Sequence, residues 1–255
     1  MNINWIGLWT LVRQEIDRTF RVAIQTLVTP WISALLYIFI FGYVIGGRIE
    51  LIAGVRYIDF VLPGILMMSV MTAAFMHSSS SLYFARFIRT IEEILVAPFS
   101  HIEMVLGYVI GAVARALIVG VGILVIAVFF GAANFAHVGL FLLYVTLVAT
   151  IFSFLGLLVG LWAKNFEQLN VLNTFIIMPF SFLGGIFYSV HMLPERIQPI
   201  LHVNPFFYFI DGIRYSMIGI QESNHIIGFT LIFSLVFVLG GLTVYLFKIG
   251  WRIRA

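Results

Sequence analysis

Long stretches without a charged side chain dominate the chain. A helix needs about 20 apolar residues to cross the hydrocarbon core of a bilayer. Stretches that lack Asp, Glu, Lys and Arg over more than that length are 22–47, 60–85, 116–163, 168–194 and 223–247. The third is too long for one helix, and the turn formers Gly and Asn in 131–137 divide it. The pattern predicts six membrane-spanning helices at about residues 26–46, 59–83, 104–130, 138–163, 169–189 and 226–247.

The composition agrees with an all-α membrane protein. Of the 255 residues, 62% are hydrophobic and only 10% are charged, whereas soluble domains carry about 25% charged residues. Such a chain cannot cover a surface that faces water, so lipid must be its main solvent. Because there is no cysteine, disulfides and thiolate metal sites are excluded. The histidines show no ligand spacing, so we expect no metal site, and the net charge of +3 gives no reason to expect nucleic acid.

The distribution of basic residues predicts the orientation. With six spans, both termini lie on one side of the membrane. That side holds nine basic residues, namely Arg13, Arg18, Arg21, Arg86, Arg89, Lys164, Lys248, Arg252 and Arg254. The opposite side holds four, namely Arg48, Arg56, Arg196 and Arg214. Cytoplasmic loops carry the excess of Lys and Arg, so both termini are expected in the cytoplasm.

Residues 1–24 have the pattern of an amphipathic helix that lies in the membrane interface. One face of the helical wheel carries the apolar residues Trp5, Leu8, Trp9, Val12, Ile16 and Phe20. The opposite face carries Gln14, Asp17, Arg18 and Arg21. Two interpretations stay open. The helix is a plain anchor for the first span, or its polar residues, with Arg13, Asp17 and Arg18 as candidates, also contact a cytoplasmic partner.

A second amphipathic segment follows the second predicted span, at residues 86–98. Its apolar stripe consists of Phe87, Ile88, Ile91, Ile94 and Leu95, and its charged side of Arg89, Glu92 and Glu93. Pro98 ends the segment, because the residue before a proline avoids the helical region. The pattern predicts a short helix with its charged side toward the cytosol. It is either an ordinary interfacial turn or a docking helix for a cytosolic subunit.

The segment after the fifth predicted span is unusually apolar for a loop. It is rich in aromatic residues and carries few charges across residues 184–215. A helical pair that dips back into the outer half of the membrane fits this composition, because non-helical backbone at that depth must be covered by protein or line a cavity. The segment is therefore either part of the outer end of a pathway or a rigid cap.

Four segments together resemble the type-2 permeases of ABC exporters, a family that includes drug, polysaccharide and Nod-factor exporters. The segments are Gln25-Thr-Leu-Val-Thr-Pro30, Phe60-Val-Leu-Pro-Gly64, Ile91-Glu-Glu-Ile-Leu-Val-Ala-Pro98, and Gly184-Gly-Ile-Phe-Tyr188 followed by Leu193-Pro194, Asn204-Pro205 and Arg214. The resemblance extends over essentially the whole chain. Each motif is weak by itself, but their order and spacing are fairly specific.

The resemblance implies a type-2 transmembrane domain over residues 25–252, in a bacterial inner membrane and with both ends cytoplasmic. It implies that residues 86–98 form a coupling helix seated in an ATPase subunit, with Arg89, Glu92, Glu93 and Pro98 as the coupling residues. It implies an extracellular re-entrant pair from Met192 to about Gly219. The outer gate would comprise Gly184, Gly185, Tyr188, Pro194, Asn204, Pro205 and Arg214. Two permeases and two ATPases make the usual transporter.

The sequence contains no means of hydrolysing ATP. Lys164 follows Ala163 and Lys248 follows Phe247, so no Gly-Lys pair exists for a phosphate-binding loop. We therefore expect a permease subunit rather than an enzyme, with no cofactor of its own. ATP and Mg²⁺ would bind to a separate cytosolic subunit. The substrate is expected to be amphipathic or lipid-linked, because the predicted spans are apolar and aromatic.

Two other classes of membrane protein, an ion-coupled transporter and an enzyme, fit the sequence less well. An ion-coupled secondary transporter usually places acidic residues inside the membrane. Here Asp59 and Glu103 lie at span ends, and Arg115 is the only ionised side chain well inside a span. A membrane enzyme could use His77 with the following serines, but neither a Gly-x-Ser-x-Gly elbow nor a His-Glu-x-x-His pair occurs. Small residues such as Gly107 and Gly111 are read as helix-packing positions.

Overall fold

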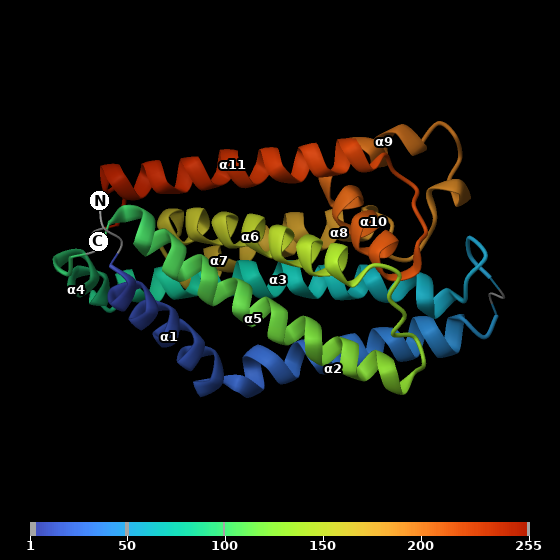
Figure 1. Ribbon diagram of the computed structural model, residues 1–255, viewed down its shortest axis with the longest axis horizontal. Coiled ribbons are helices and arrows are strands. Elements are labelled where there is room, and N and C mark those ends of the chain that lie inside the picture. Colours follow the sequence, from blue (N-terminus) through green and yellow to red (C-terminus); the bar gives the residue numbers. More distant parts are fainter. Residues whose placement is uncertain (1–3, 49–50, 99, 254–255) are drawn as a thin grey trace.

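The computed structural model describes residues 4–48, 51–98 and 100–253, and this part of the chain is helical without β-strands (Figure 1). Arg254, counted above among the basic residues, lies outside it. The α-helices are α1 Trp5–Arg21, α2 Thr29–Tyr37, α3 Tyr57–Phe87, α4 Thr90–Val96, α5 His101–Phe129, α6 Val138–Trp162, α7 Phe166–Leu172, α8 Met178–Leu183, α9 Gln198–Val203, α10 Pro205–Ile218 and α11 His225–Ile249. Three segments are π-helical: η1 Ile24–Val28 runs into α2, η2 Ile38–Ile45 extends α2, and η3 Asn173–Ile177 joins α7 to α8. The segment η4 Val190–Met192 is a 3₁₀ turn.

Five helical runs are long and apolar enough to cross a membrane. They are Ile24–Ile45, Tyr57–Phe87, His101–Phe129, Val138–Trp162 and His225–Ile249. Each coincides, within a few residues, with a span predicted from the hydrophobic pattern, so five of the six predicted helices are confirmed as elements. The long helices α3, α5, α6 and α11 run along the long axis of the molecule (Figure 1).

The predicted span at 169–189 is wrong at its C-terminal end. The helical run α7–η3–α8 starts at Phe166 and ends at Leu183, and it is not among the five runs that are long and apolar enough to cross a membrane. Its end has a local cause. Gly184 and Gly185 follow, and Gly185 adopts a φ of +83°, a backbone angle that residues with a Cβ rarely adopt. The chain therefore leaves the helix there instead of continuing to residue 189.

The centre of the molecule is α3, which packs most closely against α6. Two glycines one helical turn apart on α6 make this approach possible. A Cβ on Gly156 would lie 2.5 Å from the carbonyl oxygen of Phe75, and one on Gly160 would lie 2.9 Å from that of Ser79. Because these neighbours are backbone atoms, no side-chain movement could make room. Small residues at helix contacts serve this purpose in membranes, where apolar lipid removes the hydrophobic drive for association.

The amphipathic helix α1 packs against α5 on the expected pair of small residues. A Cβ on Gly107 would lie 2.4 Å from Leu11, and one on Gly111 would lie 2.4 Å from Glu15. The apolar face predicted for this helix is divided in two. Leu8 and Val12 are buried, whereas Trp5 and Trp9 are 70% and 66% exposed. The buried face of α1 also includes the carboxylate of Glu15, which the helical wheel does not indicate.

The close approach of α3 and α6 yields a stability prediction. Replacing Gly156 by Ala should lower the free energy of unfolding by about 1–3 kcal/mol, because the added methyl group overlaps backbone atoms. Gly139→Ala on the same helix is the matched control, since a Cβ there meets nothing within 4 Å. Thermal unfolding of both variants in one detergent is the measurement. Equal midpoints for the two variants would contradict the packing described here.

Candidate coupling surface and buried outer network

The helix α4 lies at one end of the molecule, together with the start of α1 and the end of α11 (Figure 1). It presents the side chains of Glu92 and Glu93 to the outside, whereas Ile91 is buried against the bundle. Arg89 and Pro98, which flank the helix, are also exposed. The four residues predicted to couple to an ATPase therefore gather on one accessible surface, called the coupling surface below.

The short helix does not cover the whole predicted segment 86–98. Arg86 and Phe87 still belong to α3, and the chain then turns sharply at Arg89, which has a φ of +63°. The predicted stripe is correspondingly broken, because Phe87 and Ile88 remain exposed while Ile91 packs inward. A left-handed residue interrupts the helical period, and a helical wheel drawn across it cannot be correct on both sides. The helix ends at Val96, before Pro98.

A carboxylate fixes the chain on both sides of the coupling surface. Glu103 accepts hydrogen bonds from the backbone N–H of Asn4 at 2.7 Å and of Ser100 at 2.6 Å. The hydroxyl of Ser100 in turn accepts from the N–H of Glu103, which completes a capping box at the start of α5. Asn4 itself caps α1 by accepting from the N–H of Gly7. One side chain thus joins the first turns of α1 and α5.

A basic side chain anchors the other side. Nη1 of Arg86 donates to the carbonyl oxygens of Gly160 and Leu161 at 2.6 and 3.1 Å, at the C-terminal end of α6. Arg252 donates to the carbonyl of Trp162 at 3.1 Å. Cations are favourable at this end of a helix, because the last carbonyls have no partner within it and carry partial negative charge. In the sequence, both arginines contributed only to the charge asymmetry that predicts the orientation.

The candidate partner residues of α1 differ in surroundings. Arg13 and Asp17 form an exposed pair with Nε and Oδ2 3.9 Å apart, which contributes little to stability. Arg18 instead turns toward α3, where its Nη2 donates to the hydroxyl of Ser80 at 3.3 Å. Arg13 and Asp17 remain available to another protein, whereas Arg18 belongs to the wall of a pocket.

The structure also brings an acidic residue into the bundle. Glu15 of α1 is 4% exposed, and its Oε2 lies 3.0 Å from Nε2 of His77 and accepts from the hydroxyl of Ser81 at 2.6 Å. Burial raises the pKa of the Glu15 carboxyl, but the contacts with His77 and Ser81 outweigh burial, so this pKa lies below its ordinary value. The sequence did not predict this contact, because the helix that carries Glu15 was expected to lie in the membrane interface, apart from the spans.

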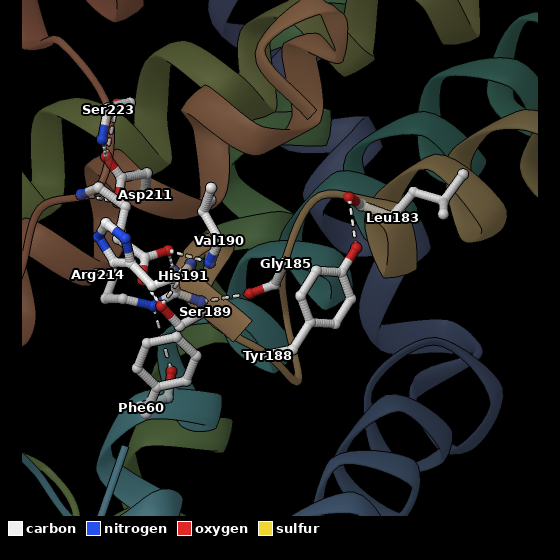
Figure 2. A network of polar contacts seen from close by, with 11 residues as sticks. Phe60, Leu183, Gly185, Tyr188, Ser189, Val190, His191, Asp211, Arg214 and Ser223 are labelled. Atoms are coloured by element: carbon white, nitrogen blue, oxygen red, sulfur yellow. Dashed lines mark hydrogen bonds and ion pairs between the residues drawn. The ribbon is translucent and has the colours of Figure 1, made fainter. Parts of the chain in front are cut away.

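At the opposite end, a buried arginine on α10 joins three segments (Figure 2). Arg214 is 0% exposed, and its Nη2 donates to the carbonyl of Gly185 at 2.5 Å. Its guanidinium carbon lies 3.8 Å from the centre of the Phe60 ring, a cation–π contact. Nε donates to the carbonyl of the same Phe60 at 3.4 Å. The residues 60–64 and 184–188, far apart in sequence, therefore meet around one side chain.

Two carboxylates complete this cluster, called the outer network below because the outer gate was predicted at these residues. Oε2 of Glu222 lies 3.6 Å from Nη1 of Arg214, and its carboxylate also accepts from the hydroxyl of Ser189. Asp211, fully buried, accepts from the backbone N–H groups of Glu222 and Ser223 at 3.0 and 2.9 Å. Figure 2 shows Asp211 and Arg214 on the same helix, directed toward the loop segments. The network fixes the loop after α10 and the turn after α8 to each other.

The remaining residues predicted for the outer gate lie around this network. Asn204 caps α10 by accepting from the N–H of Phe206 and donates to the carbonyl of Phe180 at 2.8 Å. Pro205 occupies the first turn of α10, where its missing N–H is harmless. Gly184 is buried, and the hydroxyl of Tyr188 donates to the carbonyl of Leu183 at 2.9 Å. Pro194 is exposed and outside the cluster.

Comparison with known proteins identifies the family. Residues 7–218 match the sequence profile described as "ABC-2 type transporter". The chain belongs to the ABC-2 type transporter family. It is 42% identical to the inner membrane transport permease YadH of Escherichia coli K12 over 223 residues, which cover 87% of each chain. It is 30% identical to nodulation protein J of Rhizobium meliloti over 220 residues, or 85% of this chain and 82% of that protein.

Membership in this family identifies the chain as the transmembrane subunit of an ABC transporter. The recognition made from the four motif segments is thereby confirmed. Nodulation protein J of Rhizobium leguminosarum bv. viciae is a more distant relative, 26% identical over 226 residues, or 87% of this chain and 85% of that protein. Of the segments on which the resemblance rested, 91–98 carries the coupling surface, and 60–64 and 184–214 meet in the outer network. Residues 25–30 lie apart from both, in η1 and the start of α2.

Glu222 and Asp211, the carboxylates of the outer network, were not among the site residues predicted from the sequence. Both lie in or beside the segment that was judged too apolar for a solvated loop. A signal was present, since Arg214 lies within eight residues of both acids in a stretch otherwise poor in charge. Spacing alone did not pair them, because the loop after α10 must fold back before Glu222 reaches Arg214.

Removal of the buried cation should destabilise the outer network strongly. Arg214→Met should lower the free energy of unfolding by about 3–5 kcal/mol, because Glu222 is left as an uncompensated buried charge. Adding Glu222→Gln should restore part of the loss. Arg196→Met, at an exposed position, is the control. Thermal unfolding in detergent measures all three, and an unchanged midpoint for Arg214→Met would contradict the described role.

Loss of the carboxylate at Glu103 should loosen the start of α1. Glu103→Gln offers one carbonyl oxygen where two backbone N–H groups require an acceptor, so the amides of the first turns of α1 should exchange hydrogen several-fold faster. Glu195→Gln, in the exposed turn before α9, serves as the control. Hydrogen-exchange mass spectrometry of peptides from α1 is the measurement. Identical protection in the two variants would show that Glu103 does not hold α1.

Proposed function

We propose that the chain is the permease subunit of an ATP-driven exporter in the bacterial inner membrane, acting as a dimer with two copies of a cytosolic ABC ATPase. The observation that carries this proposal is the coupling surface. A seven-residue helix exposes Glu92 and Glu93 at one end of the molecule and is fixed there by contacts to α3 and α5. A helix held in this way can transmit a displacement, which an unattached loop cannot do.

The distribution of basic residues supports a cytoplasmic location for the coupling surface. Arg86, Lys164 and Arg252 line one pocket. Lys248 lies in the last turn of α11, whose end is at the same end of the molecule as α4 (Figure 1). Arg56 and Arg196 lie toward the other end, where Arg56 pairs with Asp59 at 2.7 Å. Both termini would then lie in the cytoplasm. In this arrangement α7–η3–α8 forms the sixth crossing, and α9 and α10 form the re-entrant outer pair.

The outer network supports the role of a gate at the extracellular side. Helix α10 is buried on almost every turn, and it carries a charge cluster that binds the turn at Gly185 and the start of α3. Buried charges in a membrane protein are costly, and they concentrate where function requires them. We propose an amphipathic or lipid-linked substrate. The exposed surface of the bundle is rich in large apolar and aromatic side chains, which favour contact with a substrate that is itself partly apolar.

The partner is identified first by purification. The tagged full-length chain is extracted from native membranes in mild detergent, and copurifying proteins are identified by mass spectrometry. A stoichiometric soluble subunit with a phosphate-binding loop supports the proposal. If crosslinked membranes yield no ATPase, the exporter is contradicted and an ion-coupled transporter takes its place. The buried pair of Glu15 and His77, 3.0 Å apart, would then be the first site to test.

Charge reversal tests the coupling surface itself. In Glu92→Lys/Glu93→Lys, two exposed carboxylates become cations, so retention of the copurifying ATPase should fall by about tenfold, because like charges would then face each other across the contact. Glu195→Lys, in the exposed turn before α9 at the other end of the molecule, is the control. The helical content measured by circular dichroism should be unchanged in both variants. Normal ATPase retention and stimulation by the double variant would disprove the docking role.

A further inference from the structure

A pocket that is partly open at the surface lies between α1 and the neighbouring helices, at the end of the molecule that carries α4. It has a volume of about 600 Å³ and lies between α1, η1, the last turns of α3, α4 and α5. Its wall includes Arg18 and Arg21 from α1, Arg115 from α5, and Ile94 from α4. None of the proposed coupling residues or outer-gate residues lines it. The pocket is large enough for the polar head of a lipid and the first part of its chains.

The charge of the pocket wall is unbalanced. Three guanidinium groups, on Arg18, Arg21 and Arg115, face one carboxylate, on Glu15. That carboxylate already contacts His77 at 3.0 Å and Ser81 at 2.6 Å. Within the described residues, no acidic side chain forms an ion pair with any of the three arginines. The wall therefore carries a surplus of positive charge that an anion would neutralise.

Several donors on this wall lack strong partners. Nε of Arg115 is buried and has no hydrogen-bond acceptor among the described residues, and its Nη2 only reaches the carbonyl of Thr26 at 3.4 Å. Nη2 of Arg18 donates to Ser80 at 3.3 Å. The buried hydroxyl of Tyr108, also on this wall, has no partner in the same part of the chain. Unsatisfied buried donors are costly, so an acceptor-rich group is expected among them.

The remainder of the wall is apolar. Met76, Phe84 and Ile88 line it beside the arginines. On the other side of α1, Trp5 and Trp9 are exposed, as expected for aromatic rings at the headgroup depth of a membrane. A free phosphate ion would satisfy only the arginines. A molecule with an anionic head and apolar chains would satisfy both halves of the wall.

We propose that this pocket binds the phosphate headgroup of an anionic membrane lipid. The guanidinium groups of Arg18 and Arg115 donate to the phosphate oxygens, and Arg21 adds positive charge at the edge of the pocket. Guanidinium groups match the geometry of phosphate oxygens and make stronger hydrogen bonds to them than to neutral acceptors. The bound lipid lies between α1 and α4 and links the interfacial helix to the short helix that carries Glu92 and Glu93.

Lipid binding to the purified full-length chain tests the proposal. Thermal shifts in detergent are titrated with dioctanoyl phosphatidylglycerol, with zwitterionic dioctanoyl phosphatidylcholine, and with inorganic phosphate. We expect saturable stabilisation by phosphatidylglycerol and a much smaller effect of the other two. Equal shifts for both lipids would overturn the proposal. Displacement of phosphatidylglycerol by inorganic phosphate at the same concentration would also overturn it, since the ligand would then be the free anion.

Variants of the wall locate the site. Arg18→Gln/Arg115→Gln should weaken phosphatidylglycerol binding by about tenfold or more, because two charge-assisted contacts are lost. Lys248→Gln, which removes an exposed charge at the same end but outside the pocket, should bind as the wild type does.

A second variant remains informative if the double variant unfolds. Gln25→Glu keeps the size of an exposed residue on the wall and adds a negative charge there, so it should also weaken binding. Wild-type affinity in Gln25→Glu, or in a folded double variant, would show that the lipid binds elsewhere.

Discussion

The close contact between α3 and α6 is the constraint on which the rest of the structure depends. In lipid, apolar side chains gain nothing by leaving the solvent for another helix, so helix association depends on tight packing and on satisfied polar groups. Gly156 and Gly160 supply the packing, because α6 lies directly against backbone atoms of α3 there. The other helices are placed around this pair. As a result α3, which would otherwise be one span among several, becomes the buried axis of the bundle.

The two candidate sites are both attached to this axis. Near its outer end, the carbonyl and the ring of Phe60 contact Arg214. Near its inner end, Arg86 binds the last carbonyls of α6, and α4 follows after a sharp turn at Arg89. A helix of 31 residues packed along its whole length is stiff. In the proposed transporter, a force on α4 would therefore reach the outer network through α3 and not through the peripheral helices.

The charged side chains at the two ends of the molecule differ in how many partners they have. In the outer network, Arg214 is matched by Glu222 and by backbone carbonyls, and Asp211 is matched by backbone N–H groups. Each charged group of the outer network thus has polar partners within the described protein. At the end that carries α4, Oε2 of Glu15 contacts His77 and Ser81, and the three arginines on the same pocket wall outnumber this one carboxylate. The first arrangement suits a rigid structural joint, and the second suits a site for an external anion.

The sequence by itself determined the class of protein, the position of five apolar helices, the amphipathic helix at the start and the family. These features depend on composition and on periodicity within one element, which a linear pattern contains. Only the tertiary structure decided that the run after Phe166 ends at Leu183, that α4 starts after Arg89, and that Glu15 faces His77. The same holds for the joining of Phe60, Gly185, Arg214 and Glu222. Each of these results depends on a left-handed residue or on contacts between helices distant in sequence, and no pattern along a single helix carries that information.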